Sequence, residues 1–456
     1  MDTGKLLQLA RKAVGLLRDE VNKGGFRPQI RVLVKHKVRE FEITEKSSRY
    51  STSFEPYEKS DWSTAVHELI EKRVKPLTLF KELTDTISAE YRNDLIAKGY
   101  NLPSQVEFWL SNFVSVVLYE ELEGTLTEER LLDIIATFKS ELDSGPHEYD
   151  VKAFINGVNL KVESINLDNG ILLRKPKPVD LEYEHDAYFP MWQEPLHIPN
   201  AILEVKMRAV NELQVYEKIE QVIMALRLFH LGSIHTDVQF ESQKTVIWPI
   251  GLVRRGHGQM LASAYSYTID APSAMVLKKF WDCTGTIIPM KITDKRHGSL
   301  YIALTRYNNA LLESVEVERN LMTAVMGLEA LYVLSGERGE MSFRLSLRTA
   351  KLLGLLGSDP LEVCKVLEES YIVRSKVGHG LVVSNVARTK IGDLLKKILE
   401  YLRKSVTFFV LGSKIMSKGD WVSLLDKSMI DHDSFEQLKS KVEACLRDFP
   451  REVMER

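Results

Sequence analysis

Hydrophobic positions in the first 145 residues recur mainly at helical spacing. Residues 1–22 place apolar side chains three and four positions apart, which predicts an amphipathic helix. Residues 29–43 alternate apolar with charged side chains, which predicts a strand. From residue 61 to 142 the spacing is helical again, with one long segment over 102–123. We therefore predict that residues 1–145 form a mainly helical N-terminal region with one early strand.

Turn signals and strand-like runs begin near residue 146. The run VKAFI-NG-VNLKV predicts a β-hairpin, because Asn156 and Gly157 can both take the positive φ of a type I′ turn. A second turn, ending at Gly170, leads into the run ILLRK. Together these signals predict a small antiparallel meander over 148–175.

The next hundred residues mix strands, a helix and irregular chain. Residues 176–200 are rich in proline and predict an irregular connection. Residues 202–208 predict a strand, residues 212–230 an amphipathic helix, and residues 234–270 further strands. We therefore predict a β-rich α+β domain over 146–297.

Continuous helical spacing starts near residue 298. Helices are predicted near 299–314, 317–334, 343–355, 360–377 and 386–412, with a further one near 434–447. Gly336 and Gly357 stand where two of these helices should stop. The predicted fold is an α+β multidomain protein. Its mixed α/β N-terminal region is followed by an all-α helical bundle over 298–415 and a helical tail over 416–456.

Composition narrows the functional classes. The chain has 456 residues, which is too long for a single hydrophobic core. Its formal net charge of −2 excludes a globally basic nucleic-acid coat but allows a local phosphate-binding groove. No window approaches 18 uninterrupted apolar residues, so no membrane span is expected. The N-terminus is charged throughout and lacks a secretory apolar core, so a cytoplasmic protein is expected.

Motifs for metals and cofactors are missing from the sequence. The three cysteines, Cys283, Cys364 and Cys445, have no metal-ligand spacing, and we expect them to be reduced thiols. The sequence also has no Walker A loop, GxGxxG, HExxH or GxSxG motif. We therefore expect neither a metal nor a cofactor.

One pair of residues stands out as candidate chemistry. Arg374 is followed, after four intervening residues, by His379. The same spacing occurs at Arg31 and His36, but that copy lies in the predicted strand over 29–43. An odd separation in a strand puts the two side chains on opposite faces, so we interpret the earlier copy as chance.

Arginine and histidine suit metal-independent cleavage of RNA by its own 2′-hydroxyl. The reaction needs a proton removed from that hydroxyl, charge stabilised on phosphorus, and the leaving 5′-oxygen protonated. Histidine exchanges protons near neutral pH, and arginine offers a planar fork of donors that matches phosphate oxygens. On an ideal helix Arg374 and His379 would point ~140° apart. We expect Gly378 and Gly380 to end or bend the helix so that His379 can turn back.

Three stretches give these residues a context. They are LEAL at 328–331, FRLSLRTA at 343–350, and Y-x-x-R-S-x-x-x-H-G at 371–380. In this order and spacing they resemble the HEPN superfamily, and in particular its ApeA-like branch, over about 300–412. Many active members carry Asn, Asp or His directly after the arginine, where this sequence has Ser375.

The resemblance implies a HEPN helical bundle that acts as an endoribonuclease, with Arg374 and His379 as the catalytic pair. It implies a homodimer joined through the bundle, in which two copies of the motif form a composite cleft. It further implies RNA, often tRNA, as substrate, and a role in anti-phage defence through toxin-like growth arrest. A phage-derived trigger would fit such a role.

Several neighbours are candidates to support this pair. Glu329 is either a residue that orients Arg374 or an ordinarily solvated carboxylate, Ser375 follows the arginine directly, and Tyr371 is either a wall of the site or core packing. Candidate contacts to RNA phosphates are Arg344, Arg348 and Lys376, although charged helix faces are also commonly just solvated.

Simpler roles and other functions stay open. Arg374 could form a structural salt bridge to Glu329 or Glu369, and His379 could be an ordinary histidine at a helix C-terminus. The bundle could be a non-catalytic module that binds nucleotide or RNA, or that only dimerises. A helical interaction scaffold, with the N-terminal region carrying the function, is the other alternative.

Overall fold

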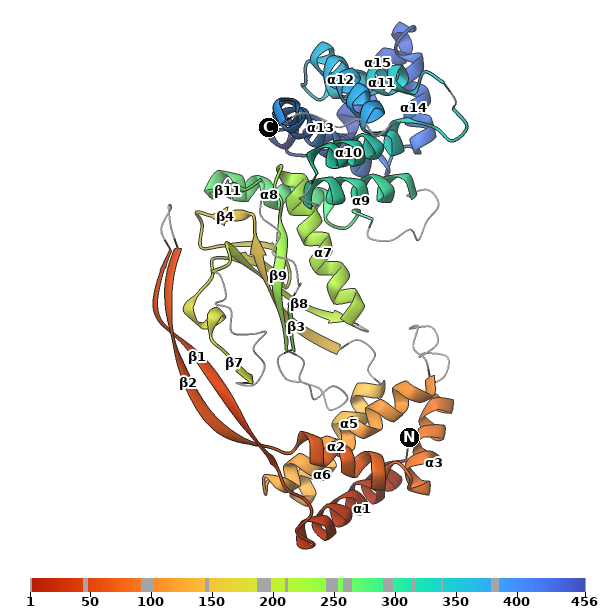
Figure 1. Cartoon of the computed structure of the whole chain (residues 1–456). Helices are drawn as coiled ribbons and strands as arrows, with labels where there is room; N and C mark the ends of the chain where they lie inside the picture. Colours follow the sequence, from red (N-terminus) through yellow and green to blue (C-terminus); the bar gives the residue numbers. More distant parts are fainter. Residues whose placement is uncertain are drawn as a thin grey trace.

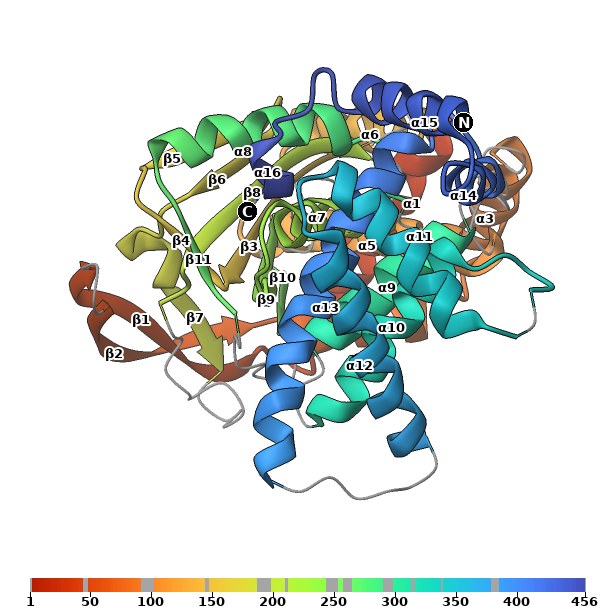
Figure 2. The same ribbon diagram turned by 90° about the horizontal axis from the view of Figure 1, so that it is seen from above.

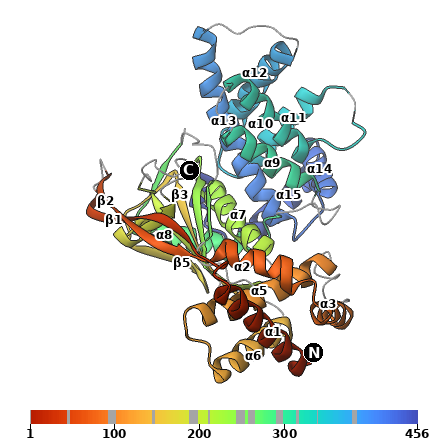
Figure 3. The same cartoon turned by 60° about the horizontal axis from the view of Figure 1, so that its bottom comes forward.

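The computed structural model describes most of the chain. The described residues are 2–43, 48–91, 102–143, 147–186, 198–209, 212–242, 253–256, 265–289, 298–312, 316–337, 339–378 and 385–455. An N-terminal group of helices and a C-terminal helical bundle lie at opposite ends of the molecule, with a β-sheet between them (Figures 1 and 3). The fold class is α+β, as the sequence predicted.

The N-terminal helices build a core of their own. They are α1 (Thr3–Asn22), α2 (Ser63–Leu69) continued by a π-helical turn (Ile70–Val74), α3 (Thr78–Glu90), α5 (Leu102–Leu122) and α6 (Glu128–Asp143). Helix α5 is apolar on several sides, and Phe113 and Val117 are fully buried between its neighbours. The predicted helical segments over 1–22 and 61–142 are confirmed for the described residues.

A long β-ribbon runs from these helices alongside the sheet (Figure 1). It consists of β1 (Gln29–Ile43) and β2 (Ser48–Asp61), which pair antiparallel, and β7 (Tyr183–Asp186) pairs with the other edge of β1. Val38 and Phe41 of the ribbon pack against a small buried cluster of Phe154, Leu181 and Ile202. The strand predicted over 29–43 is confirmed.

The central sheet has six strands in the order β10-β9-β3-β8-β6-β5. Their bounds are β3 (His147–Asn156), β5 (Ser164–Asp168), β6 (Ile171–Arg174), β8 (Ala201–Ala209), β9 (His235–Ser242) and β10 (Val253–Gly256). Each neighbouring pair is antiparallel. Since β8 and β9 both flank β3, they run parallel to each other, and helix α7 (Glu212–Phe229) makes the crossover between them.

The hairpin predicted at Asn156-Gly157 is wrong. Strand β4 (Val158–Leu160) does not return along β3 but pairs in parallel with β11 (Tyr267–Ile269). Both edges of β3 are taken by strands distant in sequence, so a local turn signal could not reveal its partners. Gly157 has φ 87°, and a Cβ there would lie 2.8 Å from the Ser233 carbonyl oxygen. The glycine therefore lets the chain leave the sheet rather than close a hairpin.

Other parts of this region follow the prediction more closely. The turn at Gly170, with φ 84°, joins β5 and β6 into an antiparallel hairpin. The predicted irregular stretch contains a 3-10 turn (Pro178–Leu181) and β7. Helix α8 (Ala271–Thr284) was not predicted, and it begins at Asp270, whose side chain accepts a hydrogen bond from the Ser273 amide. Helices α7 and α8 pack together on one face of the sheet (Figure 2).

The C-terminal bundle contains every helix predicted for it. These are α9 (Gly298–Leu312), α10 (Val317–Tyr332), α11 (Met341–Leu355), α12 (Pro360–Gly378) and α13 (Asn385–Gly412). Gly336 and Gly357, the predicted stops, have φ values of 97° and 93°. The predicted terminal helix corresponds to α15 (His432–Cys445). The tail predicted to be helical over 416–456 also contains two helices whose bounds were not predicted, α14 (Lys418–Lys427) and α16 (Glu452–Glu455).

The bundle, the tail and the α/β region share one hydrophobic core. Trp421 of the tail is 1% exposed and packs edge-on against Phe408 of α13. The C-terminal turn of α7 is capped by side chains from three other elements. The Tyr267 and Tyr307 hydroxyls and the Arg403 guanidinium donate to the carbonyl oxygens of residues 226–228, each over 2.8 Å. The boundaries predicted at 297/298 and 415/416 therefore do not separate independent cores.

Candidate functional site

The candidate site lies where α12 crosses α10. Helix α12 carries Tyr371, Arg374 and Ser375 near its C-terminal end, and α10 carries Glu329. Arg374 and Tyr371 are three residues apart, so they share one face of α12. That face meets α10, and the half-buried side chains of Arg374 and Glu329 are 27% and 14% exposed.

Glu329 pairs with the Arg374 guanidinium through both carboxylate oxygens. The Arg374 Nη1 lies 3.0 Å from Glu329 Oε1, and Nη2 donates to Oε2 over 3.1 Å. The Tyr371 hydroxyl donates to the same Oε1 over 3.0 Å, and its ring lies 4.9 Å from the guanidinium carbon. A bidentate pair stacked on an aromatic ring fixes the plane of a guanidinium. Arg374 is therefore preorganised, as the prediction for Glu329 required.

Burial and the Glu329 charge raise the pKa of Tyr371 by more than the Arg374 charge lowers it. Burial first, and then the neighbouring Glu329 carboxylate, raises the pKa of Tyr371, so its hydroxyl stays protonated and keeps donating. A guanidinium has five N–H donors, and Glu329 engages one on each terminal nitrogen. Further donors remain on this guanidinium, whose side chain is 27% exposed. A phosphate oxygen can accept a hydrogen bond from one of them without displacing Glu329.

The second half of the predicted pair, His379, lies outside the described residues, as does Gly380. Helix α12 is described to Gly378. The convergence of Arg374 with His379 therefore stays a prediction. Ser375 is exposed, and Lys376 lies on α12 without a described side chain.

The structure contradicts the predicted RNA contact of Arg348. Its side chain is 2% exposed and pairs with two carboxylates, Glu337 over 2.6 Å and Asp426 over 2.7 Å. It also donates to the Tyr332 carbonyl oxygen over 2.7 Å. Hydrogen bonds from Arg348 first, and then from the Leu334 amide and Arg344, lower the pKa of Glu337 to about 2. A guanidinium enclosed in this way cannot reach RNA, and Arg348 instead joins α11 to α14 and to the end of α10.

Arg344, one turn earlier on α11, is different. Its side chain is 42% exposed and makes one longer contact, 3.2 Å, to Glu337. It keeps its place as a candidate phosphate contact. The other copy of the motif is separate from this site, since Arg31 lies in β1 and pairs with Asp61 over 2.5 Å.

Sequence reasoning missed the partners of Arg348. Asp426 is 78 positions away along the chain, on a helix whose bounds were not predicted. Glu337 lies in the turn before α11, where its only local signal is a carboxylate near a helix start. Neither residue has a spacing that could have marked the network.

A groove next to the candidate site separates α12 from α13. It has a volume of about 700 Å³ and is lined by Glu362, Lys365, Val366, Glu369, Ile372, Val373, Lys390, Ile391, Asp393, Leu394 and Lys397. We call it the α12–α13 groove. Ile372 is 55% exposed in it, and because it lies two positions before Arg374 it points to a different side of α12. The groove therefore presents an apolar strip with charged rims on another side of α12 from the candidate site.

Comparisons with known proteins add no relative. No family model matches the chain, and no curated protein or solved structure matches it either. Over the described ranges, no group of three or more His, Cys, Asp or Glu side chains is arranged to hold a metal ion. Over the same ranges, no helix combines the length and apolarity needed to cross a bilayer.

Proposed function

We propose that this chain is a HEPN endoribonuclease that cleaves RNA by attack of the 2′-hydroxyl, without a metal. The observation that carries the proposal is the Arg374 guanidinium. It is held flat by Glu329 and Tyr371, its side chain is 27% exposed, and it lies near the end of α12, five positions before His379. A preorganised cation that still offers donors is what stabilises charge developing on a phosphate.

The reaction divides between two side chains. The His379 imidazole takes the proton of the 2′-hydroxyl, and the 2′-oxygen then attacks phosphorus. Arg374 binds the non-bridging phosphate oxygens as their charge grows. The bond from phosphorus to the 5′-oxygen breaks, and a protonated imidazole returns a proton to that oxygen. The products are a 2′,3′-cyclic phosphate and a 5′-hydroxyl.

Two imidazoles serve these proton transfers best, which requires two copies of the motif. The α12–α13 groove supplies a surface on which two chains can meet. Its apolar strip is rimmed by three acidic residues, Glu362, Glu369 and Asp393, and by three lysines, Lys365, Lys390 and Lys397. In a two-fold arrangement the acids of one copy can face the lysines of the other. The proposal therefore includes a homodimer that pairs through this groove.

The biological setting follows from the resemblance alone. We propose a cytoplasmic protein of anti-phage defence that arrests growth by cleaving RNA, with tRNA as the expected class. A phage-derived component would act as the trigger. The α/β and N-terminal regions would then recruit the substrate or sense that trigger.

Growth of expressing cells tests the proposal. Wild-type expression should arrest growth and fragment cellular RNA, and His379→Ala should abolish both effects. His36→Ala is the matched control, because it removes the histidine of the other Arg-x4-His copy and should leave the arrest intact. Unchanged RNA fragmentation by His379→Ala would refute the assignment.

One observation favours a second function, a non-catalytic module that binds RNA or nucleotide. Glu329 neutralises Arg374 within the bundle, which is also what a purely structural ion pair would do. Under this function RNA binds without turnover, and His379→Ala changes neither RNA integrity nor growth. Glu329→Gln separates the two roles. It should weaken cleavage for an orienting residue, and should only destabilise the bundle for a structural one.

A further inference from the structure

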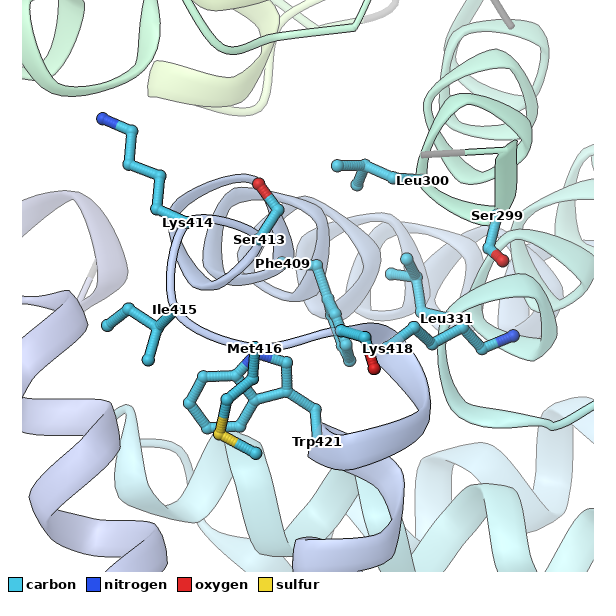
Figure 4. A pocket seen from close by; sticks show the side chains of 11 residues that line it. Ser299, Leu300, Leu331, Phe409, Ser413, Lys414, Ile415, Met416, Lys418 and Trp421 are labelled. Atoms are coloured by element: carbon cyan, nitrogen blue, oxygen red, sulfur yellow. The ribbon is translucent and has the colours of Figure 1, made fainter. Parts of the chain in front are cut away.

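A second cavity lies on another side of α10, away from Arg374. Its volume is about 380 Å³, and we call it the α13–α14 cavity. It is lined by Ser299, Leu300, Leu331, Phe409, Ser413, Lys414, Ile415, Met416, Ser417, Lys418 and Trp421 (Figure 4). The walls come from the start of α9, the end of α10, the end of α13, and the loop that leads into α14. Leu331 and Glu329 are two positions apart on α10, so they point to different sides of that helix.

The lining carries charge of one sign. It contains two lysines and three serines, and no aspartate or glutamate is among the lining residues. Lys414 is exposed, whereas Lys418 is partly buried and donates to the Val333 carbonyl oxygen over 2.6 Å. Figure 4 shows these two lysines extending to opposite sides of the loop. The N-terminal end of α9 adds partial positive charge to the same wall.

Apolar side chains form the floor of the cavity. Leu300, Leu331 and Phe409 are 6%, 1% and 5% exposed, so their positions are set by the core beneath them. The loop above is held by hydrogen bonds. Trp421 Nε1 donates to the Gly412 carbonyl oxygen over 3.1 Å, and the Ser413 hydroxyl donates to the carbonyl oxygen of residue 410 over 2.8 Å. The hollow is therefore largely preformed, as small-molecule sites usually are.

We propose that the α13–α14 cavity binds a small aromatic carboxylate. The ring lies against Leu300, Leu331 and Phe409, and the carboxylate pairs with the Lys414 ammonium at the rim. An aromatic ring suits the apolar floor better than a bare inorganic anion, because the anion has no apolar surface to pack against these side chains. A carboxylate on the ring adds a charge-paired hydrogen bond to the Lys414 ammonium, which a neutral ring cannot form. The site is separate from Arg374, and its ligand binding does not depend on the proposed nuclease activity.

Calorimetric titration of the full chain tests this site with two matched probes. Indole-3-acetate carries the carboxylate, and indole-3-acetamide has the same ring without the charge. We expect the acid to bind about 10-fold more tightly than the amide, since a hydrogen bond to a charged group contributes about 1.5 kcal/mol or more. Lys414→Gln should remove this preference. The control Lys427→Gln, an exposed lysine at the end of α14, should keep it.

Ser299→Trp provides a second variant, because it fills the cavity from its half-buried rim and should abolish binding of both probes. Three outcomes would overturn the proposal. They are no binding of the acid to wild type at millimolar concentration, equal affinity for acid and amide, or a Lys414→Gln protein that still prefers the acid.

Discussion

Substitution of Arg348 distinguishes most clearly between a structural role and an RNA-binding role for this side chain. We consider Arg348→Met, which keeps much of the side-chain volume and removes all donors. The change takes a buried partner from the Tyr332 carbonyl and a counter-charge from Glu337 and Asp426. Asp426 is 47% exposed and can be rehydrated, so most of the cost comes from the other two groups.

The magnitude follows from these groups. The pKa of Glu337 lies at about 2 instead of 4.5, which corresponds to about 3 kcal/mol at about 1.36 kcal/mol per unit. The Leu334 amide and Arg344 also lower this pKa and remain in the variant, and solvent screens the pair, so the share lost with Arg348 is about 2 kcal/mol. An orphaned buried carbonyl costs a further ~1 to 3 kcal/mol. Arg348→Met should therefore destabilise this part of the bundle by about 4 kcal/mol.

Amide hydrogen exchange of α11 and α14 measures this loss locally, which suits a chain with more than one core. About 4 kcal/mol corresponds to a roughly 1000-fold loss of protection. Arg344→Met, which removes one exposed contact, should cost less than about 1 kcal/mol. The reasoning is refuted if the exchange protection of α11 and α14 is the same in Arg348→Met as in Arg344→Met, while the Arg348→Met protein binds RNA more weakly.

The exchange protection of α11 and α14 below pH 4.5 tests the same ion pair. The folded-state pKa of Glu337 is depressed, so its stabilising contribution is complete above pH 4.5 and is lost as pH falls toward 2. Wild-type protection of α11 and α14 should fall over this interval. In Arg348→Met the fall should be much smaller, because the ion pair that depresses the pKa is gone. An equal acid dependence in both proteins would mean that other carboxylates dominate.

Three other substitutions test the packing and the site. Arg403→Met removes donors from two buried carbonyls at the end of α7 and from the Val453 carbonyl, and should cost about 3 kcal/mol, read as lost exchange protection of α7 and α13; protection within 10-fold of wild type would contradict it. Gly327→Ala should cost ~1 to 3 kcal/mol in thermal unfolding, because its Cβ would lie 2.7 Å from Leu402 Cδ2 in a fully buried contact; a raised melting temperature would contradict it. Tyr371→Phe keeps the ring against the guanidinium and loses the hydrogen bond to Glu329, so RNA cleavage should fall by about 5-fold; a loss as large as that of Arg374→Ala would give the hydroxyl a chemical role.

Local signals predicted those elements whose geometry is set locally. The alternation over 29–43 matched β1, and Gly336 and Gly357 marked two real helix ends. The sequence failed where partners are distant. Asn156-Gly157 has the composition of a hairpin turn, yet β3 pairs with two strands that come much later in the chain. Helix α8 was not predicted, although it directly follows the residues predicted as strands over 234–270.

The same distinction applies to the site. Glu329 and Arg374 are 45 positions apart, and only the resemblance to a known family linked them before the structure placed them together. Arg344 and Arg348 look alike in sequence, one turn apart on α11. The fold exposes the first and encloses the second between α10 and α14. Burial decided their roles, and burial depends on a tail helix that carries no local signal of its contact.

RNA cleavage by the purified chain in the presence of EDTA tests the central claim most directly. The account predicts fragments that end in a 2′,3′-cyclic phosphate, produced by wild type and by His36→Ala. General acid–base catalysis contributes about 100-fold or more, so His379→Ala should lose at least that much of the rate. Arg374→Lys should be nearly as inactive, since a point charge cannot replace a bidentate fork. Cleavage by His379→Ala at the wild-type rate, or fragments with other ends, would contradict the account.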